Sequence, residues 1–204
     1  MGFYARHILP HIIDLAMRNK ESARLRADWI PNARGDVLEI GIGSGLNLPF
    51  YSAQVGHVYG VDFSLELQQM ARKRAAGRTN IEFLTQSAEE QLPLADASID
   101  TIVMTWTLCS ITNPDMALQQ MRRVLKPSGR LLFIEHGRAA DPGVVAWQDR
   151  LTPVWKRIAG GCHLNRKVDE LISAAGFEIT ELKTFYLPGP HPMTYTYRGF
   201  AQVA

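Results

Sequence analysis

The stretch Val37-Leu38-Glu39-Ile40-Gly41-Ile42-Gly43-Ser44-Gly45 decides the fold. Apart from one acid, its first four residues are apolar, as in a buried strand. The three glycines that follow at alternate positions allow positive φ and let a ligand approach the backbone without meeting a Cβ atom. The stretch therefore predicts a strand that enters a nucleotide-binding turn. The preceding strand and its acid disfavour the alternative of a plain surface loop.

The spacing of the glycines indicates which ligand the turn binds. The dinucleotide fingerprint G-x-G-x-x-G places its third glycine in the first helix, under a pyrophosphate. Here the glycines run G-x-G-x-G, and Glu39 stands two residues before the first. A carboxylate at that place repels a pyrophosphate and suits a positive amino group. Asp62 ends the next apolar run, about 20 residues on, where an acid accepts hydrogen bonds from ribose hydroxyls. The pair favours an amino-acid nucleoside over NAD.

On these residues the chain resembles the class I S-adenosylmethionine-dependent methyltransferases, whose first motif is an acid followed by G-x-G-x-G and whose second is the acid that closes strand two. The run Val124-Leu125-Lys126-Pro127-Ser128-Gly129-Arg130 before a strand resembles a further, independent signature of that family. The resemblance implies S-adenosylmethionine as cofactor. It also implies an α/β, Rossmann-like class I methyltransferase fold: a mostly parallel seven-stranded sheet with helices on both faces and a C-terminal antiparallel hairpin.

The cofactor contacts that the resemblance implies come from the glycine turn and from the ends of the first four strands. Many relatives carry an acid where Ser87 stands, so the backbone at Ala88 or the carboxylate of Glu89 is the alternative contact for the adenine. The expected contacts are Glu39, Gly41, Gly43, Gly45, Asn47, Leu48, Asp62, Phe63, Ser87, Ala88, Glu89 and Thr105.

Strand-like and helix-like runs alternate from residue 36 to about residue 136, which predicts a parallel sheet with covering helices. Ser64 and Asn113-Pro114 are expected to begin helices, and Gly176 to end one. The expected strands are 36–41, 57–62, 81–85, 99–104 and 130–136, followed by β-rich runs at 177–186 and 193–203 that suit the hairpin. The expected helices are 45–54, 64–76, 114–125, 143–158 and 166–175.

Size and composition fit one methyltransferase domain, residues 31–204, in a chain of 204 residues that is 46% hydrophobic. The net charge of +2 is scattered, so no nucleic-acid partner is expected. Cys109 and Cys162 are far apart, and no further ligands stand at metal spacing beside Cys162-His163, so neither a metal site nor a disulfide framework is predicted. No apolar run approaches the roughly 18 residues of a membrane span. We expect a cytoplasmic protein, with peripheral contact at the inner face of a membrane as the alternative.

The N-terminal segment 1–30 precedes this domain and is expected to be helical after Pro10. Its apolar residues alternate with Arg18, Lys20, Arg24 and Arg26. One interpretation is a lid whose apolar side covers the cofactor pocket. The other is an interfacial helix that places residues 1–20 on a membrane, with the basic residues toward anionic headgroups.

The acceptor site is expected beyond the carboxyl ends of strands four and five, the usual crevice of open α/β sheets. His136 is the candidate general base, since histidine is the side chain that ordinarily exchanges protons near neutral pH; the alternative is a buried structural histidine. Cys109 is disfavoured as a nucleophile because nothing beside it in the sequence lowers its pKa. The candidate substrate-binding residues are Tyr4, Trp106, Cys109, His163, Arg166 and His191.

Landmarks from Leu-Cys-Ser at 108–110 through Glu-His at 135–136 to Gly-Cys-His-Leu-Asn-Arg at 161–166 resemble one branch closely, the small alkyl-thiol methyltransferases. That resemblance implies S-methylation of a small thiol or sulfide. Phosphatidylethanolamine N-methyltransferases and quinone C-methyltransferases share the core, so a lipid amine or a quinol remains an alternative acceptor. A non-catalytic cofactor-binding module is the rival from another class, and the oligomeric state stays open.

Overall fold

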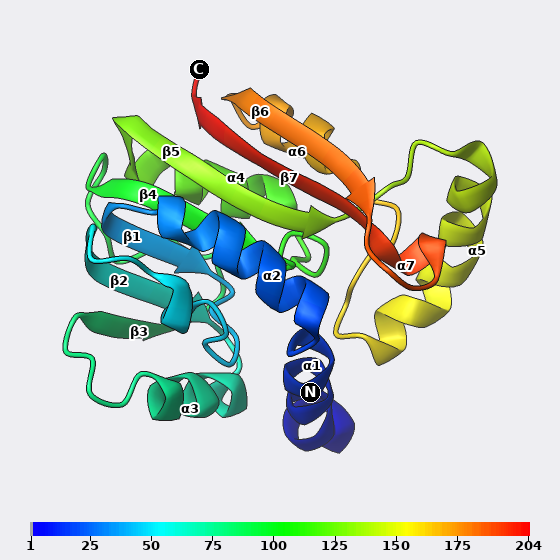
Figure 1. Ribbon diagram of the computed structural model, residues 1–204, viewed down its shortest axis with the longest axis horizontal. Helices are drawn as coiled ribbons and strands as arrows, with labels where there is room; N and C mark the ends of the chain where they lie inside the picture. The colour runs from blue at the N-terminus through cyan, green and yellow to red at the C-terminus, as the bar shows by residue number, and fades with distance from the viewer. Residues whose placement is uncertain (1) are drawn as a thin grey trace.

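The computed structural model describes residues 2–204 and has a single sheet of seven strands with helices on both faces (Figure 1). The strand order is β3-β2-β1-β4-β5-β7-β6. Strands β1 to β5 pair in parallel, and β7 pairs antiparallel with both β5 and β6. This confirms the predicted mostly parallel sheet with a C-terminal antiparallel hairpin.

The bounds of the strands are β1 Gly35–Ile40, β2 Val55–Asp62, β3 Ile81–Thr85, β4 Ile99–Thr105, β5 Leu125–His136, β6 Phe177–Tyr186 and β7 Tyr195–Val203. The α-helices are α1 Leu9–Met17, α2 Lys20–Trp29, α3 Leu65–Arg74, α4 Pro114–Val124, α5 Pro142–Ile158, α6 Val168–Ala174 and α7 His191–Thr194. A π-helical segment, η1, covers Tyr4–Ile8, and two 3-10 turns cover η2 Ile30–Asn32 and η3 Leu48–Phe50.

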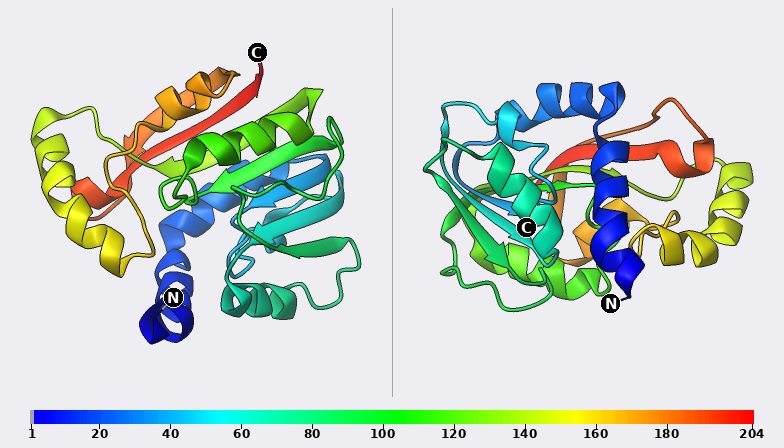
Figure 2. Two further views of the ribbon diagram at one scale, coloured as in Figure 1. Left: turned by 180° about the vertical axis from the view of Figure 1, so that it is seen from behind. Right: turned by 90° about the horizontal axis from the view of Figure 1, so that it is seen from below.

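The core forms two layers because successive side chains of a strand point to opposite faces of the sheet. In β4, Ile102 and Met104 face the layer that contains α4 and α6. Val103, between them, faces the layer that contains Leu25 and Trp29 of α2. Figure 1 shows α2 in front of the sheet, and Figure 2 shows α4 and α6 on the opposite face. Both faces of the central strands are therefore buried, as in other parallel sheets.

The predicted helix ends are confirmed by their hydrogen bonds. The Ser64 side chain accepts a hydrogen bond from the N–H of Leu67 at 3.3 Å, and α3 begins at the next residue. The Asn113 side chain accepts from the N–H of Met116 at 3.3 Å, with Pro114 in the first helical position of α4. Gly176 follows α6 with a φ of 85°, and its N–H donates to Ser173.

The predicted helix at 45–54 is wrong: the structure has only the 3-10 turn η3 there. Pro49 has no N–H and disfavours helical backbone in the residue before it. Gly45 has a φ of 79°, outside the helical region. The Asn47 side chain is held by hydrogen bonds to β1 and β4 rather than by the next helical turn. The chain therefore crosses from β1 to β2 with almost no helix.

The N-terminal segment is helical from Tyr4, before Pro10, and it breaks at Arg18-Asn19. Asn19 caps α2 because its side chain accepts a hydrogen bond from the N–H of Ser22 at 2.8 Å. The other boundaries differ from expectation by a few residues, the largest change being at β5. Leu125 already pairs with Ile99 of β4, so β5 begins five residues before the predicted strand.

The sheet places the carboxyl ends of β1, β2, β4 and β5 at one edge. The strand order reverses between β1 and β4, and ligands of open α/β sheets bind at such a point. Helices α1 and α5 lie at this edge, toward which the arrows of β1, β4 and β5 point (Figure 1). Among residues 2–204, no helix is both long and apolar enough to span a bilayer.

Candidate functional site

The glycine turn follows β1, and its three glycines have different surroundings. All three have positive φ: 67° at Gly41, 53° at Gly43 and 79° at Gly45. A Cβ atom at Gly41 would collide with the Thr107 side chain, and one at Gly45 would press on Leu48 and Ala71. At Gly43 the nearest neighbour of such an atom would be the carbonyl oxygen of Gly41, at 3.8 Å. Neighbouring side chains thus pack against both ends of the turn, and the space beside its middle residue, Gly43, leaves room for a ligand.

Asp62 ends β2 beside this turn, as the sequence predicts. Its Oδ2 accepts a hydrogen bond from the N–H of Gly43 at 2.9 Å, and its Oδ1 accepts from the N–H of Ser64 at 2.8 Å. Burial raises the pKa of Asp62, and the backbone hydrogen bonds from Ser64 and Gly43 oppose that rise. The carboxylate therefore connects the glycine turn to the start of α3.

Glu39 lies behind the turn, with both carboxylate oxygens occupied by other side chains. Oε1 accepts from Asn47 Nδ2 at 2.8 Å, and Oε2 accepts from the Tyr51 hydroxyl at 2.7 Å. Burial raises the pKa of Glu39 to about 7, against the opposing effect of these two hydrogen bonds and of Arg26. The sequence places Glu39 in contact with a ligand's amino group. In the structure its partners are Asn47 and Tyr51, and Asn47 also donates to Thr105 Oγ1 at 3.0 Å.

Two arginines attach the N-terminal helices to the glycine turn. Arg26 of α2 donates to Asn47 Oδ1 at 3.0 Å and to the carbonyl of Met17 at 2.8 Å, and burial lowers its pKa to about 10. Arg74 of α3 forms an ion pair with Asp14 of α1 at 2.8 Å and also donates to the carbonyl of Ser44. The buried side chain that α1 presents to the turn is therefore the acid Asp14, whereas the lid interpretation expects apolar residues there.

The remaining predicted cofactor contacts divide into exposed and packed positions. Phe63, just after Asp62, is 59% exposed beside the turn. The Leu48 side chain is buried and packs against the turn at Gly45, so its place as a cofactor contact stays a prediction. Ser87 Oγ accepts from the N–H of Glu89, and Glu89 Oε1 accepts from the N–H of Thr112 at 2.9 Å. Since Glu89 is engaged by the loop before α4, Ala88 is the freer of the two alternatives to Ser87.

Trp106 follows β4 with an unusual backbone, because its φ of 50° is positive in a residue that is not glycine. Its N–H donates to the carbonyl of Ile134 at 2.8 Å, so the chain still follows β5 at this point. The Arg26 guanidinium lies 4.8 Å from the centre of the indole ring. Trp106 therefore lies between the cofactor turn and the residues beyond β4.

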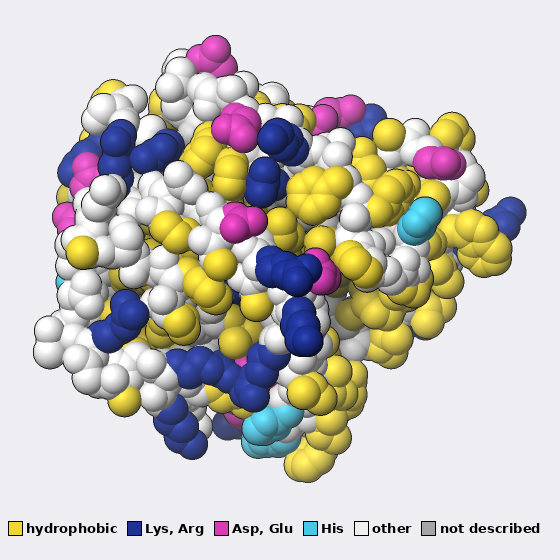
Figure 3. All heavy atoms as spheres, viewed as in Figure 1, with side chains coloured by type: hydrophobic (Ala, Val, Ile, Leu, Met, Phe, Trp, Pro, Cys, Tyr) yellow, Lys and Arg dark blue, Asp and Glu magenta, His cyan; other side chains and the backbone are white. Residues whose placement is uncertain are grey.

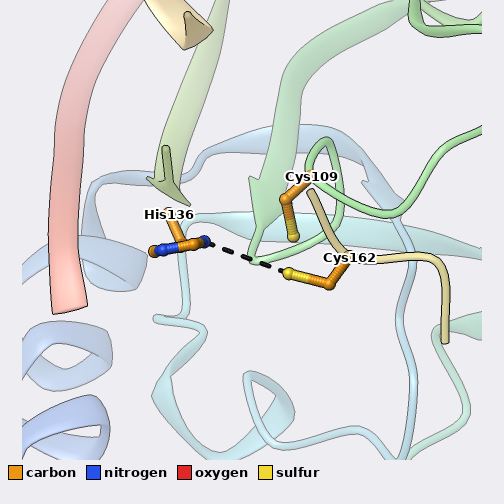
Figure 4. Close-up of side chains that lie close together, drawn as sticks. All are labelled: Cys109, His136 and Cys162. Carbon is orange, nitrogen blue, oxygen red and sulfur yellow. Dashed lines mark hydrogen bonds between the residues drawn. The ribbon is translucent and has the colours of Figure 1, made fainter. Parts of the chain in front are cut away.

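Three residues from the sequence analysis lie close together beyond β4 and β5: Cys109, His136 and Cys162 (Figure 4). The two Sγ atoms and a ring nitrogen of His136 all lie within 4.8 Å of one another. Cys162 Sγ is 4.0 Å from His136 Nδ1. The proximity of the two thiols raises the pKa of Cys109, which burial raises further, and lowers the pKa of Cys162. Cys109 and His136, which are far from Cys162 in the sequence, therefore lie beside it, and sequence spacing gave no indication of this group.

Ionisable side chains lie next to these three residues. Glu135 is fully buried, and its Oε1 accepts from the N–H of Thr107 at 2.9 Å. Its Oε2 has no hydrogen-bond partner within the part of the chain that the structure describes, and burial raises its pKa far above the usual range. Arg166 is half-buried and donates to the carbonyl of Leu108. The N–H of His163 donates to the carbonyl of Cys109 at 2.8 Å, which ties the loop after α5 to the loop after β4.

Two predicted substrate-binding side chains lie outside this group. The Tyr4 hydroxyl donates to the carbonyl of Ile158 at 2.9 Å, so Tyr4 connects η1 to the end of α5. His191 is exposed and stacks on Tyr186, with ring centres 4.3 Å apart. Its neighbour Pro192 reaches the site instead, because its carbonyl oxygen lies 3.4 Å from His136 Nε2.

Exposed apolar side chains line the same edge of the molecule. Figure 3 shows hydrophobic side chains gathered over η1, α1 and α5, with basic side chains next to them. On η1 and α1 they include Ile8, Ile12 and Leu15, which follow one another at helical spacing, and Leu15 is 73% exposed. The exposed apolar strip comprises Phe3, Tyr4, Ile8, Ile12, Leu15, Trp147, Val154 and Ile158.

Sequence reasoning missed several residues that shape the site. Arg26, Arg74 and Tyr51 hold the turn, and Glu135 and Gln148 support the acceptor side. Gln148 donates to the carbonyls of Gly137 and Pro192, at 2.9 and 3.2 Å. The available signal was an acid or amide in an otherwise apolar run, as at Glu135 beside His136. Contacts that join residues far apart in the sequence gave no such signal.

Comparisons with known proteins agree with this geometry. Residues 38–133 match a family described as a methyltransferase domain. The chain is 36% identical over 167 residues to thiol S-methyltransferase TMT1B of Rattus norvegicus, covering 77% of this chain and 68% of that protein. It is 30% identical over 164 residues to a phosphatidylethanolamine N-methyltransferase of Cereibacter sphaeroides, covering 79% of each.

The fold also occurs in solved structures. One is a chain in the complex between the Haloferax volcanii Trm112 methyltransferase activator and a methyltransferase, with a TM-score of 0.72 and 18% identity over 98% of this chain and 96% of that one. Further matched structures are described as S-adenosylmethionine-dependent methyltransferases. At such identities these structures show the fold alone.

Proposed function

Because the chain belongs to the class I S-adenosylmethionine-dependent methyltransferases, we propose that it transfers the methyl group to the sulfur of a small or lipophilic thiol or sulfide. The observation that carries the proposal is the group of polar side chains beyond β4 and β5, where Cys162 Sγ lies 4.0 Å from His136 Nδ1 and close to Cys109. The nearby Cys109 thiol and the charge of Arg166 lower the pKa of the Cys162 thiol, although burial opposes them. An acceptor thiol at this place meets the same groups.

The cofactor is S-adenosylmethionine, and the turn fits it. The open space at Gly43 admits the ligand to the backbone, and Asp62 offers a carboxylate to ribose hydroxyls at the end of β2. At the other end of the turn, Arg26 donates a hydrogen bond to Asn47 and fixes its side chain. When bound, S-adenosylmethionine supplies a methyl group on a positively charged sulfur.

The residues of the chain have two tasks in this reaction: to orient the acceptor in line with the methyl carbon and to exclude water. Since His136 Nε2 faces the carbonyl of Pro192, the proton of the neutral ring belongs on Nε2, and Nδ1 faces the thiols as a proton acceptor. Arg166 favours the anionic form of sulfur over the neutral form. Trp106 and the buried Leu108 keep the acceptor side apolar.

The test is a panel of acceptors incubated with labelled S-adenosylmethionine: hydrogen sulfide, an alkyl thiol, phosphatidylethanolamine vesicles and a demethylated quinol. We expect label in the methylated alkyl thiol. Label confined to the lipid or the quinol would contradict the thiol assignment. Binding of S-adenosylhomocysteine without turnover on any acceptor would favour a cofactor-binding module that regulates a partner.

Phosphatidylethanolamine is the second candidate acceptor, and the exposed apolar strip favours it. The strip lies at the edge of the molecule that contains α1 and α5, and basic side chains lie beside it, as expected of a helix that binds an anionic membrane surface. In this alternative, residues 1–20 bring the site to the bilayer. The resemblance to the Cereibacter sphaeroides enzyme supports the same acceptor.

Vesicle flotation tests the role of the strip. We expect the variant Ile12→Ser/Leu15→Ser to float with anionic vesicles about 10-fold less than the parent, because the two side chains are the apolar contacts that α1 offers to lipid, at ~25 cal/mol per Å² buried. The matched control Ala16→Ser changes an exposed position on the same helix and should float like the parent. Equal flotation of the double variant and the parent rejects the membrane role and leaves residues 1–30 as a lid.

A further inference from the structure

We propose that Cys109 Sγ, His136 Nδ1 and Cys162 Sγ form a three-ligand site for a thiophilic divalent cation such as Zn²⁺, with its fourth position open to the acceptor sulfur. The inference rests on the proposed thiol acceptor. It gives His136 Nδ1 the role of a metal ligand in place of a proton acceptor.

The three ligand atoms come from three different segments and converge at one point. Cys109 follows β4, His136 ends β5, and Cys162 lies in the loop after α5 (Figure 4). The atoms lie within 4.8 Å of one another, and Cys162 Sγ is 4.0 Å from His136 Nδ1. Zinc binds sulfur at about 2.3 Å and imidazole nitrogen at about 2.0 Å, so tetrahedral ligand atoms are about 3.5–3.8 Å apart. Shifts below about 1 Å bring the three side chains to that geometry.

The orientation of His136 fits metal ligation. Its Nε2 lies 3.4 Å from the carbonyl oxygen of Pro192, and Gln148 Nε2 donates to the same oxygen at 3.2 Å. Ligating histidines generally donate their other ring N–H to a carbonyl or carboxylate, which fixes the tautomer. The lone pair on Nδ1 therefore points toward the two sulfur atoms.

Three protein ligands and one open position are typical of catalytic zinc sites, whereas structural sites are closed by four. The acceptor thiol would bind at the open position and release its proton to solvent, since a coordinated thiol is deprotonated. Its sulfur lone pair then forms the bond to the methyl carbon. The bond from that carbon to the donor sulfur breaks, and its electron pair stays on the donor sulfur, which becomes neutral. The thioether product is a weaker ligand than the thiolate and leaves the cation.

The test is titration of the reduced, tag-free protein with Co²⁺, a spectroscopic substitute for Zn²⁺. We expect thiolate-to-cobalt charge-transfer absorption that saturates at one cation per chain and is displaced by Zn²⁺. Cys109→Ser, His136→Ala and Cys162→Ser should each weaken the affinity at least about 100-fold, because even changes outside the ligand set cost 10–100-fold. The control His11→Ala changes an exposed histidine on α1, away from the three ligands, and should keep the absorption. Circular dichroism of each variant establishes that it is folded.

Addition of an alkyl thiol to the cobalt-loaded protein should change the charge-transfer band, and addition of the methylated thioether should not. Absence of the band in the folded parent, or its persistence in Cys162→Ser, overturns the proposal. A Cys109–Cys162 disulfide in the protein as isolated, together with no metal uptake after reduction, also overturns it. Thiol methylation without bound metal contradicts only the metal site. Metal binding without thiol methylation contradicts only the proposed acceptor.

Discussion

Asp62 accepts two backbone N–H groups, one from the glycine turn and one from the start of α3, and it is the acid closest to the open middle of the turn. We expect Asp62→Ala to weaken binding of S-adenosylhomocysteine about 10- to 100-fold, because hydrogen bonds to a charged group contribute ~1.5–3 kcal/mol. Isothermal titration calorimetry measures this affinity. Asp115→Ala, at an exposed acid in the first turn of α4, is the control and should bind like the parent. Unchanged affinity in Asp62→Ala would refute the ribose contact.

The Glu39 carboxyl group makes stability depend on pH. Its folded-state pKa of about 7 exceeds the ordinary 4.5 because it is buried among Tyr51, Asn47, Arg26 and Asp62. The folded state then binds more protons than the unfolded state between these two values, so the free energy of unfolding falls as the pH rises from about 4.5 to 7. At 1.36 kcal/mol per pKa unit the loss is about 3 kcal/mol. Urea unfolding at pH 5 and pH 7.5 measures it.

Glu39→Gln should remove this decline, because the amide keeps the shape and does not ionise. Glu178→Gln, at an exposed acid on β6, is the control and should retain the decline of the parent. The same pH dependence in Glu39→Gln and in the parent would show that Glu39 is already ionised at pH 5, or is not the group responsible, and would contradict the assignment.

Single side chains were predictable where they stand at the end of a strand. Glu39, Asp62 and His136 all do, and alternation along the strand indicates which way they point. The hydrogen-bond partners of such side chains were harder to predict from the sequence. Arg26 reaches Asn47 across 21 positions of sequence, and nothing in the composition of α2 distinguishes Arg26 from Arg24.

Helix α1 is held to the molecule by few buried side chains, and Asp14 is the polar one among them. We expect Asp14→Asn to weaken the link to Arg74 by about 2 kcal/mol, between the values for exposed and buried ion pairs. Amide hydrogen exchange in residues 9–17 should then rise about 30-fold, while exchange in β4 stays unchanged, since the helix opens locally. Glu21→Gln breaks an exposed pair with Arg24 and serves as the control. Equal amide hydrogen exchange in α1 of Asp14→Asn and of the parent would contradict the role of the Asp14–Arg74 ion pair in holding α1.

Secondary structure was predictable where periodicity and capping agree, as at α3, α4 and the strands. The helix prediction failed at 45–54, because hydrogen bonds from Asn47 to β1 and β4 replace those of a helix. Such contacts between elements override local preference, and local sequence does not contain them. The break between α1 and α2 has a local signal in Asn19, whose side chain is a good N-cap.

The donor site joins α1, α2, the glycine turn and β2, so ligand binding stabilises the molecule as one unit. At 100 times its dissociation constant, S-adenosylhomocysteine should add about 2.7 kcal/mol to the free energy of unfolding. For a domain of this size that corresponds to a rise in Tm of about 5–10 °C. Differential scanning fluorimetry measures it, with adenosine as the matched ligand that lacks the amino-acid part. A parent protein with no shift at saturation would contradict the donor site.

The arrangement of the acceptor side was the least predictable part of the molecule. The sheet explains why Cys109 and His136 approach each other, since they follow adjacent parallel strands. Cys162 joins them because the loop after α5 folds back, and the N–H of His163 bonds to the carbonyl of Cys109. That return depends on the packing of α5 beyond the sheet, and spacing in the sequence does not reveal it.

The positive φ of Trp106 places the stability of the backbone and the position of the indole ring in conflict. Left-handed backbone costs a residue with a Cβ atom roughly 1–2 kcal/mol, and glycine adopts it freely. A glycine at position 106 would recover that energy and remove the ring that lies against Arg26 between the donor and acceptor sides. Position 106 is therefore a place where selection for heat resistance and selection for turnover act in opposite directions.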